Sequence, residues 1–176
     1  MREALAELQA DLRRRGLDSL RWVRPEGIHL TLKFLGETSS DKLSAINAAL
    51  VESVKGVGPH RLWLGAVGTF GNKRRPQVLW VDLAGDLAPL GRLQQQVDLA
   101  LAAAGFPKEK RPFAPHLTLA RVRPESARAI APRLAEAVAA AQPPPATLEV
   151  RELSLMRSRL QAGGAVYEQL AAFALE

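Results

Sequence analysis

The chain has 176 residues, of which 47% are hydrophobic and 24% charged, a composition typical of one globular domain or of two small lobes sharing a core. It contains no cysteine, which excludes disulfides, thiolate nucleophiles and cysteine-ligated metals. The net charge of +6 favours an anionic partner such as nucleic acid or a phosphorylated metabolite, although a GC-rich genome would enrich arginine whatever the function.

The chain shows no targeting or membrane signal. Its longest apolar run is far shorter than a bilayer span, and its N-terminus is charged from the second residue. We therefore expect no signal peptide, no transmembrane helix and no membrane partner. Together with the absence of cysteine, this favours a cytoplasmic protein.

Hydrophobic periodicity predicts the elements of the first half of the chain. Leucines at i, i+3 and i+7 indicate a first helix that ends at Gly16, and the capping residues of "TSSD" (38–41) precede a second helix. The predicted order is a helix over 2–15, strands over 19–24 and 28–35, a helix over 41–55, and strands over 60–67 and 77–83 around the loop "GTFGNKRRP".

The second half repeats part of this order. We predict a helix over 86–104 ended by Gly105, a strand containing "HLTL" at 116–119, a helix from Pro124 to about 141, and strands over 147–157 and 165–175 joined through "LQAGG". A helix and two strands follow each of the two strands that carry a His-x-Thr phrase. This order indicates an internal duplication with one such strand in each half.

The repeated phrase is the most informative feature of the sequence. "GIHLTLKFLGE" (27–37) contains His29 and Thr31, and "PHLTLARV" (115–122) contains His116 and Thr118, 87 residues later (116 − 29). The chain has only three histidines and five threonines, so chance is a poor explanation for the repeat. The third histidine, His60, has no such threonine, and we interpret it as a surface or strand-start residue.

Strand alternation predicts where these side chains point. His29 and Thr31 share a face with Lys33, while the intervening apolar side chains and Phe34 point to the core. The second phrase alternates in the same way. Each phrase thus presents an imidazole beside a hydroxyl on a polar face that is backed by a packed one.

Two imidazoles at one site could hold a metal or act as an acid–base pair. A metal would need a third ligand, but the sequence has no cysteine, no H-E-x-x-H motif and no carboxylate beside the histidine of either phrase. An acid–base pair needs one neutral and one protonated imidazole near neutral pH, which histidine allows. With hydroxyls and cationic side chains nearby, this set suits in-line displacement at a phosphodiester.

The paired "HLTL" phrases resemble the signature of the 2H phosphoesterase superfamily. "HLTLKFLGE", "RRPQVLWVDL" and "RPFAPHLTLARV" are similar to bacterial RNA 2′,3′-cyclic phosphodiesterases, also called 2′-5′ RNA ligases. The resemblance covers residues 3 to 174. It implies an α+β fold of two pseudo-symmetric lobes, each an antiparallel sheet backed by helices, with the motifs facing one another across a central groove.

The resemblance also implies the chemistry and the roles of the residues. It implies hydrolysis of 2′,3′-cyclic phosphate ends of RNA or of cyclic nucleotides to 2′-phosphates, without metal or other cofactor. His29 would donate a proton to the leaving oxygen, and His116 would accept one from water. Thr31 and Thr118 would bind the phosphate. Arg121 matches a family arginine, but strict alternation places it on the face opposite His116.

Several further points follow from the same resemblance. Phe113 and Phe34 are candidates for stacking on a base, although core packing is favoured for Phe34. "NKRRP" (72–76) is either a contact to backbone phosphates or a solvated loop. Members of the family usually begin with a strand before the first helix, and this sequence begins at the helix. Either that strand has been lost or the sequence is incomplete at its N-terminus, and we expect residues 1–176 to form one bilobed domain. We expect a monomer.

Two other functions remain open. The same residues could join RNA ends through a 2′-5′ bond, which is the reverse of transesterification. A non-catalytic module that binds RNA or nucleotides is the alternative from another class, and it would not need paired groups for proton transfer.

Overall fold

The computed structural model describes residues 1–161 and 164–176, which form two compact units of three segments each. Unit 1 comprises Met1–Leu30, Leu62–Gly85 and Ala114–Leu148. Unit 2 comprises Thr31–Arg61, Asp86–Phe113 and Glu149–Glu176. Each unit draws on both halves of the sequence, and His29 and His116 both belong to unit 1.

The strands of unit 1 belong to an antiparallel sheet. Its order is β1 (Arg21–Trp22), β4 (His116–Arg121), β3 (Arg75–Gly85), β2 (His60–Asn72) and β5 (Thr147–Val150), in which β2 and β5 cross the boundary between the units. The hairpin of β2 and β3 is longer than predicted. Most of the expected loop "GTFGNKRRP" lies in its ladder, and only residues 73–74 form the turn.

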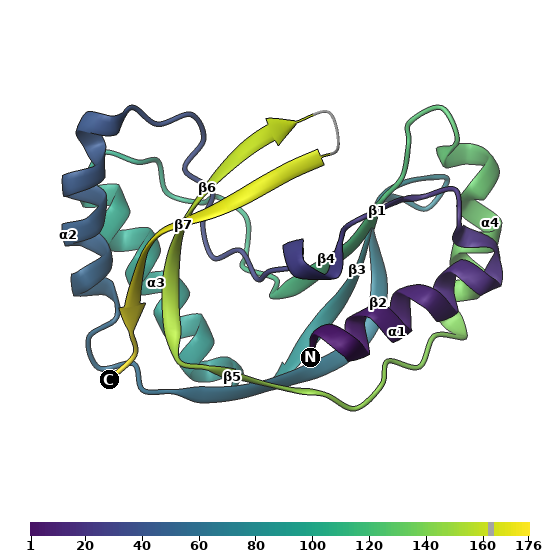
Figure 1. Ribbon diagram of the computed structural model, residues 1–176, viewed down its shortest axis with the longest axis horizontal. Helices are drawn as coiled ribbons and strands as arrows, with labels where there is room; N and C mark the ends of the chain where they lie inside the picture. The colour runs from purple at the N-terminus through teal and green to yellow at the C-terminus, as the bar shows by residue number, and fades with distance from the viewer. Residues whose placement is uncertain (162–163) are drawn as a thin grey trace. The chain divides into compact units, whose positions relative to one another are not determined.

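Helices cover one face of this sheet. Helix α1 (Arg2–Leu12) continues into a π-helical turn (Arg13–Leu17), where Gly16 has a φ of 89°. Helix α4 (Ala127–Ala139) lies next to α1 and contacts both this turn and β3 (Figure 1). The helix predicted over 2–15 is therefore confirmed. The helix predicted from Pro124 begins three residues later, because residues 124–126 form a turn instead.

Contacts from α1 fix which side of the sheet is the core. The α1 residues Leu8 and Leu12 are almost completely buried. From the same helix, Gln9 Nε2 donates to the carbonyl oxygens of Val23 at 2.8 Å and Leu119 at 3.0 Å. These bonds tie α1 to the backbone of the segment that follows β1 and of β4, so α1 holds this edge of the sheet in place.

The strand predicted over 28–35 does not form. Residues Pro25–Gly27 make one turn of 3₁₀ helix, and Leu30 then makes a single antiparallel bridge to Leu117. The chain passes from unit 1 to unit 2 directly after Leu30, so it cannot continue a ladder beside β4. Hydrophobic alternation alone does not distinguish such a segment from a paired strand.

Unit 2 combines two helices with a hairpin. A 3₁₀ turn (Ser40–Lys42) leads into α2 (Leu43–Ser53), which packs beside α3 (Leu87–Ala103), and β6 (Glu152–Gln161) pairs with β7 (Gly164–Ala174) (Figure 1). Both helices were predicted, as was the stop of α3 at Gly105, which has a φ of 89°. The strand predicted over 147–157 is divided at Arg151 into β5 and β6. The turn predicted in "LQAGG" includes residues 162–163, which lie outside the described residues.

The core of unit 2 joins these elements. It is a cluster of buried apolar side chains from α2, α3, the hairpin and the residues that directly follow these elements: Ile46, Leu50, Val54, Val57, Leu93, Val97, Leu101, Phe106, Leu153, Leu155 and Leu175. The packing of helices on antiparallel strands in both units confirms the predicted α+β class. In the part of the chain that the structure describes, no helix is long and apolar enough to cross a membrane.

Candidate active site

Strand β4 presents the second motif on the face of the unit 1 sheet opposite α1. Its burial alternates, since Leu117 and Leu119 are buried while His116 and Thr118 are partly exposed. The register places His116 opposite Asp82 of β3, and Thr118 opposite Trp80. Residues directly opposite one another in an antiparallel pair share a face. These side chains therefore define a polar face of unit 1.

A β-bulge in β4 brings Arg121 onto this polar face. Thr118 pairs with Trp80 and Ala120 pairs with Leu79, so Leu119 is an extra residue in β4. Leu119 and Ala120 are consequently both buried, and Arg121 is exposed on the same side as Thr118. The strict alternation assumed from the sequence placed Arg121 on the other face, and the bulge is the physical reason why that expectation is wrong.

The bridge at Leu30 brings the first motif to the same sheet. Leu30 lies opposite Leu117, whose side chain is buried on the core side. Because neighbouring residues of extended backbone alternate, His29 falls on the polar face, beside the register position of Thr118. His29 is exposed. Unit 1 thus holds His29, His116 and Thr118 on one face.

The two motif histidines use the same ring nitrogen in the same way. Nδ1 of His29 lies 2.8 Å from the carbonyl oxygen of Gly27, and Nδ1 of His116 lies 2.7 Å from that of Ala114. A carbonyl oxygen only accepts, so Nδ1 must carry the proton in both rings. In each ring, Nε2 is the nitrogen that this carbonyl contact does not use, and imidazole nitrogens can exchange protons with a substrate near neutral pH.

The third histidine, His60, makes a similar hydrogen bond but differs from the two motif histidines in accessibility. It also bonds the carbonyl oxygen two residues earlier, Gly58 at 3.1 Å. Its side chain is buried, however, and Nε2 is inaccessible to solvent. Of the two predicted alternatives, a surface or a strand-start residue, the structure shows the second, because the buried His60 begins strand β2. Its inaccessible Nε2 makes it unsuited to contact a substrate.

Aromatic rings pack against His116. The Phe70 ring meets the imidazole edge-on, with centroids 4.8 Å apart, and the Trp80 ring lies 6.3 Å away. Trp80 in turn packs on Gly68, where an added Cβ would lie 2.4 Å from the indole. We did not predict either aromatic contact, because Phe70 falls in the segment interpreted as a loop. The sequence did contain a signal for Trp80, because the strand pattern of "QVLWVDL" places Trp80 and Asp82 on one face.

The remaining candidate residues belong to unit 2. Thr31 is its first residue and is exposed, and Phe113 is partly buried. Phe34 is 83% exposed, so the expectation that it packs in the core is wrong. The alternation that placed it there does not apply, because residues 31–35 are not paired in a strand.

Lys33 is engaged within unit 2 rather than available to a substrate. Its side chain is 6% exposed, and Nζ forms an ion pair with Asp98 of α3 and donates to the Pro107 carbonyl oxygen at 2.6 Å. The hydrogen bond from Lys33 lowers the pKa of the Asp98 carboxyl, and the backbone N–H of Glu109 contributes to this shift. Lys33 therefore anchors residues 31–35 to α3 and to the loop that follows it. The expectation that Lys33 supplies positive charge on the polar face is wrong.

A cavity of about 440 Å³ lies elsewhere, against the helices of unit 1. Its lining includes Arg14, Arg15 and Gly16 of the turn after α1, and Arg133 of α4. Arg14 and Arg15 both pair with the carboxylate of Asp11. The cavity contains neither motif histidine, so it is separate from the candidate site.

Comparisons with known proteins identify the family. The family model described as "2′-5′ RNA ligase superfamily" matches residues 2–162. The chain belongs to the 2′-5′ RNA ligase superfamily. This confirms the resemblance to 2H phosphoesterases that the paired His-x-Thr phrases indicated.

Individual relatives carry a consistent name. The chain is 31% identical over 157 residues to an RNA 2′,3′-cyclic phosphodiesterase of Methanothermobacter thermautotrophicus, an alignment that covers 89% of this chain and 83% of the relative. It is 32% identical over 154 residues to a protein of the same name from Geobacillus stearothermophilus, covering 88% of this chain but only 47% of that longer relative.

A solved structure supports the fold of the superfamily. The crystal structure of E. coli LigT complexed with 3′-AMP matches with a TM-score of 0.69 and 26% identity, covering 97% of this chain and 92% of LigT. The α+β fold predicted from the sequence is therefore LigT-like. The roles of individual site residues remain predictions that rest on the geometry of unit 1 and on the motifs.

Proposed function

We propose that this chain hydrolyses 2′,3′-cyclic phosphodiester ends of RNA or nucleotides to 2′-phosphates. The observation that carries the proposal is the pair His29 and His116, both in unit 1 and both with Nδ1 held by a backbone carbonyl, so that Nε2 serves for proton transfer. Relatives at 31% and 32% identity are named for this activity. A pure binding module would need no such pair of oriented imidazoles.

The proposed reaction is an in-line displacement at phosphorus. His116 Nε2 accepts a proton from a water molecule as the water oxygen bonds to phosphorus. The bond to the 3′ oxygen breaks, and His29 Nε2 donates a proton to that leaving oxygen. The products are a 2′-phosphate and a 3′-hydroxyl. Thr31 and Thr118 would hold the non-bridging oxygens, whose charge grows in the transition state.

The first test is product analysis. Adenosine 2′,3′-cyclic phosphate is incubated with the protein in EDTA, and the products are followed by phosphorus NMR. We expect turnover to adenosine 2′-phosphate at a rate that EDTA leaves unchanged, since both proton-transfer groups belong to the chain. Formation of the 3′-phosphate alone, or no turnover, would overturn the proposal.

The second test assigns the histidines. His29→Ala and His116→Ala should each lower kcat/KM by ~10²–10⁴-fold, the usual contribution of a general acid or base. His60→Gln is the matched control, because His60 makes the same type of carbonyl contact but its Nε2 is inaccessible. Its activity should stay within a few-fold of the unsubstituted protein. Losses of only a few-fold in either motif variant would remove that residue from the mechanism.

Ligation is the second candidate, because the superfamily is described by that activity. Attack of a 5′-hydroxyl, in place of water, on the 2′,3′-cyclic phosphate would form a 2′-5′ bond and break the bond to the 3′ oxygen, with His116 accepting the proton of the 5′-hydroxyl and His29 donating one to the 3′ oxygen. Incubation with RNA halves that carry these ends distinguishes the two: ligated RNA that accumulates faster than the hydrolysed 2′-phosphate would favour ligation. We further propose that the protein is cytoplasmic and that it is a monomer. Sedimentation of the purified protein can test the oligomeric state.

A further inference from the structure

Two arginines face each other at the edge of the unit 1 sheet. In the pairing of β1 with β4, Arg21 lies directly opposite Arg121, and both side chains are exposed. Like charges directly opposite in a sheet are destabilising. Among the residues that the structure describes, neither arginine has an ion pair or a side-chain hydrogen bond. This pair of cations therefore lacks the internal counter-charge that would offset its repulsion.

The neighbours of Arg21 establish which face it occupies. Trp22 pairs with Ala120, whose side chain is fully buried on the helix side. The Trp22 indole donates to the Leu17 carbonyl oxygen at 3.1 Å and lies under the Arg13 guanidinium, both from the turn that follows α1. Arg21, one residue earlier, must point the opposite way. It therefore projects from the polar face that carries Thr118.

The spacing along β4 sets the distance between this pair and the catalytic motif. Arg121 lies three positions after Thr118, and a regular strand would span roughly 10 Å over that length. The bulge at Leu119 shortens this somewhat. The distance is comparable to one nucleotide of extended RNA backbone. On β3, the carboxylate of the polar face is Asp82, which lies opposite His116 rather than beside the arginines.

We propose that Arg21 and Arg121 together form a second phosphate subsite, which binds the phosphate one nucleotide before the cyclic end. The inference rests on the proposed function, because it takes the cyclic phosphate itself to lie at the histidines. Two guanidinium groups offer planar, bidentate donors to a phosphodiester, and the anion removes the repulsion between them. The subsite would make an RNA end, rather than a lone cyclic nucleotide, the preferred substrate.

The sharpest test compares substrates that differ in whether they carry the phosphate that precedes the cyclic nucleotide. Adenosine 2′,3′-cyclic phosphate is compared with the same nucleotide bearing a 5′-phosphate, and with a short RNA ending in the same cyclic nucleotide. The 5′-phosphate occupies the position of the preceding phosphodiester. The unsubstituted protein should show a higher kcat/KM for both substrates that carry this phosphate.

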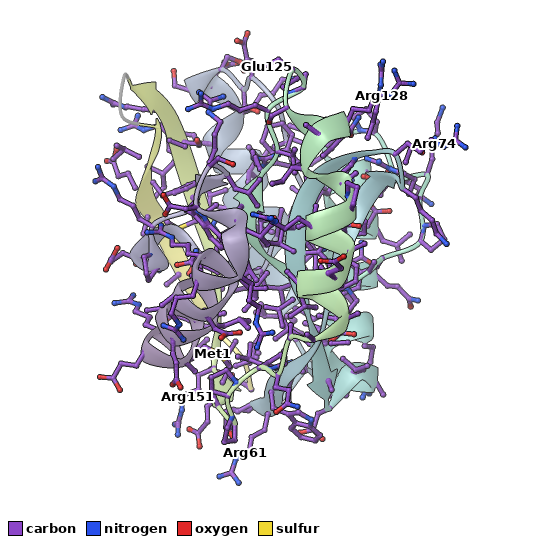
Figure 2. All side chains as sticks on the ribbon, turned by 90° about the vertical axis from the view of Figure 1, so that its right-hand side faces the viewer. Met1, Arg61, Arg74, Glu125, Arg128 and Arg151 are labelled. Carbon is purple, nitrogen blue, oxygen red and sulfur yellow. The ribbon has the colours of Figure 1, made fainter. Side chains whose placement is uncertain are left out.

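The variant that tests the subsite is Arg21→Gln. It should lose about 10-fold in kcat/KM on the two substrates with the preceding phosphate, and less than about 2-fold on the substrate without it. Its salt dependence on RNA should weaken by about one unit of the log–log slope. Arg128→Gln is the matched control, because Arg128 projects outward from α4 (Figure 2), and it should leave kcat/KM unchanged on all three substrates. Equal losses on all three substrates, or no loss on RNA, would overturn the subsite.

A binding measurement keeps this inference separate from the proposed function. If the protein turns over none of the cyclic substrates, the proposed function fails. Binding of a short RNA that already ends in a 2′-phosphate is then measured for the unsubstituted protein and for Arg21→Gln. Weaker binding by the variant would still support a phosphate subsite at the arginine pair. Equal binding would overturn it, whatever the catalytic result.

Discussion

His29 and His116 have the same backbone hydrogen bond but different surroundings. The His29 ring is exposed, whereas the His116 ring lies against the edge of Phe70 and near Trp80. An aromatic ring packed against an imidazole restricts the rotation of the imidazole. We therefore assign Phe70 as a residue that positions His116 without contacting the reacting atoms.

Substitution of Phe70 should affect turnover more than binding. Phe70→Ala removes the edge contact with His116, and we expect kcat to fall about 10-fold with a smaller change in KM, because small misplacements of a catalytic group are costly. Phe70→Tyr keeps the ring and should restore most of kcat. The control is Trp63→Ala, an exposed aromatic on the same strand with no ring contact to the histidine. A rise in KM with kcat unchanged would mean that Phe70 contacts the substrate instead.

At the scale of elements, irregularities in the strands place the functional side chains. The bulge at Leu119 in β4 places Arg121 on the same face as His116. A second irregularity lies in β2, where two residues, Gly65 and Ala66, lie opposite the single residue Asp82 of β3. A Cβ at Gly65 would lie 1.9 Å from the Asp82 carboxylate, so this position accommodates only glycine without a shift. Bulges commonly re-aim side chains near active sites.

The segment that follows the first motif is fixed by an ion pair rather than by a strand. Lys33 reaches Asp98 on α3 and the carbonyl of Pro107, while Asp98 also accepts the Glu109 N–H at 3.1 Å. One carboxylate thus joins three parts of unit 2: residues 31–35, helix α3 and the loop after it. Such a pair is nearly dry, so removing one partner leaves the other charge uncompensated.

Loss of this ion pair should destabilise the fold measurably. Lys33→Ala should lower the free energy of unfolding, measured in urea, by about 1–3 kcal/mol, the cost of leaving a buried polar group unsatisfied. Lys55→Ala breaks an exposed pair with Glu52 and should cost less than about 0.5 kcal/mol. The double variant Lys33→Met with Asp98→Asn should be more stable than Lys33→Ala, because it leaves no unpaired charge. An effect of Lys33→Ala as small as that of Lys55→Ala would contradict the anchoring role.

At the scale of the whole molecule, the sequence predicted the helices, which depend on local patterns, better than the pairing of segments that are far apart in the chain. Helices α1, α2 and α3 follow from leucine periodicity and glycine stops, which are local signals. The bridge of Leu30 to Leu117 joins residues far apart in the chain, and no local pattern specifies it. For the same reason, the sequence located His29, His116 and Thr118, but it could not reveal the bulge that brings Arg121 to them or the opposition of Arg21.

The stability of the whole chain should decrease at acid pH in a way that depends on Asp98. The pKa of this carboxyl is lowered below its ordinary value of 3.8, chiefly by the hydrogen bond from Lys33. A carboxyl whose pKa is lower in the folded than in the unfolded state stabilises the fold fully above its unfolded pKa, and this stabilisation is lost as the pH falls through the folded value. The contribution is therefore complete at neutral pH and declines below about pH 4.

Urea unfolding at pH 6 and pH 3 tests this linkage. Asp98→Asn cannot titrate, so its free energy of unfolding should be lower than that of the unsubstituted protein at pH 6, and the difference should shrink at pH 3. Glu52→Gln removes a carboxylate from the exposed pair with Lys55. This variant should lose almost as much free energy of unfolding between pH 6 and pH 3 as the unsubstituted protein does. If Asp98→Asn loses as much stability between pH 6 and pH 3 as the unsubstituted protein does, other carboxylates control the acid transition. The ion pair would then hold residues 31–35 in place without governing the acid stability of the chain.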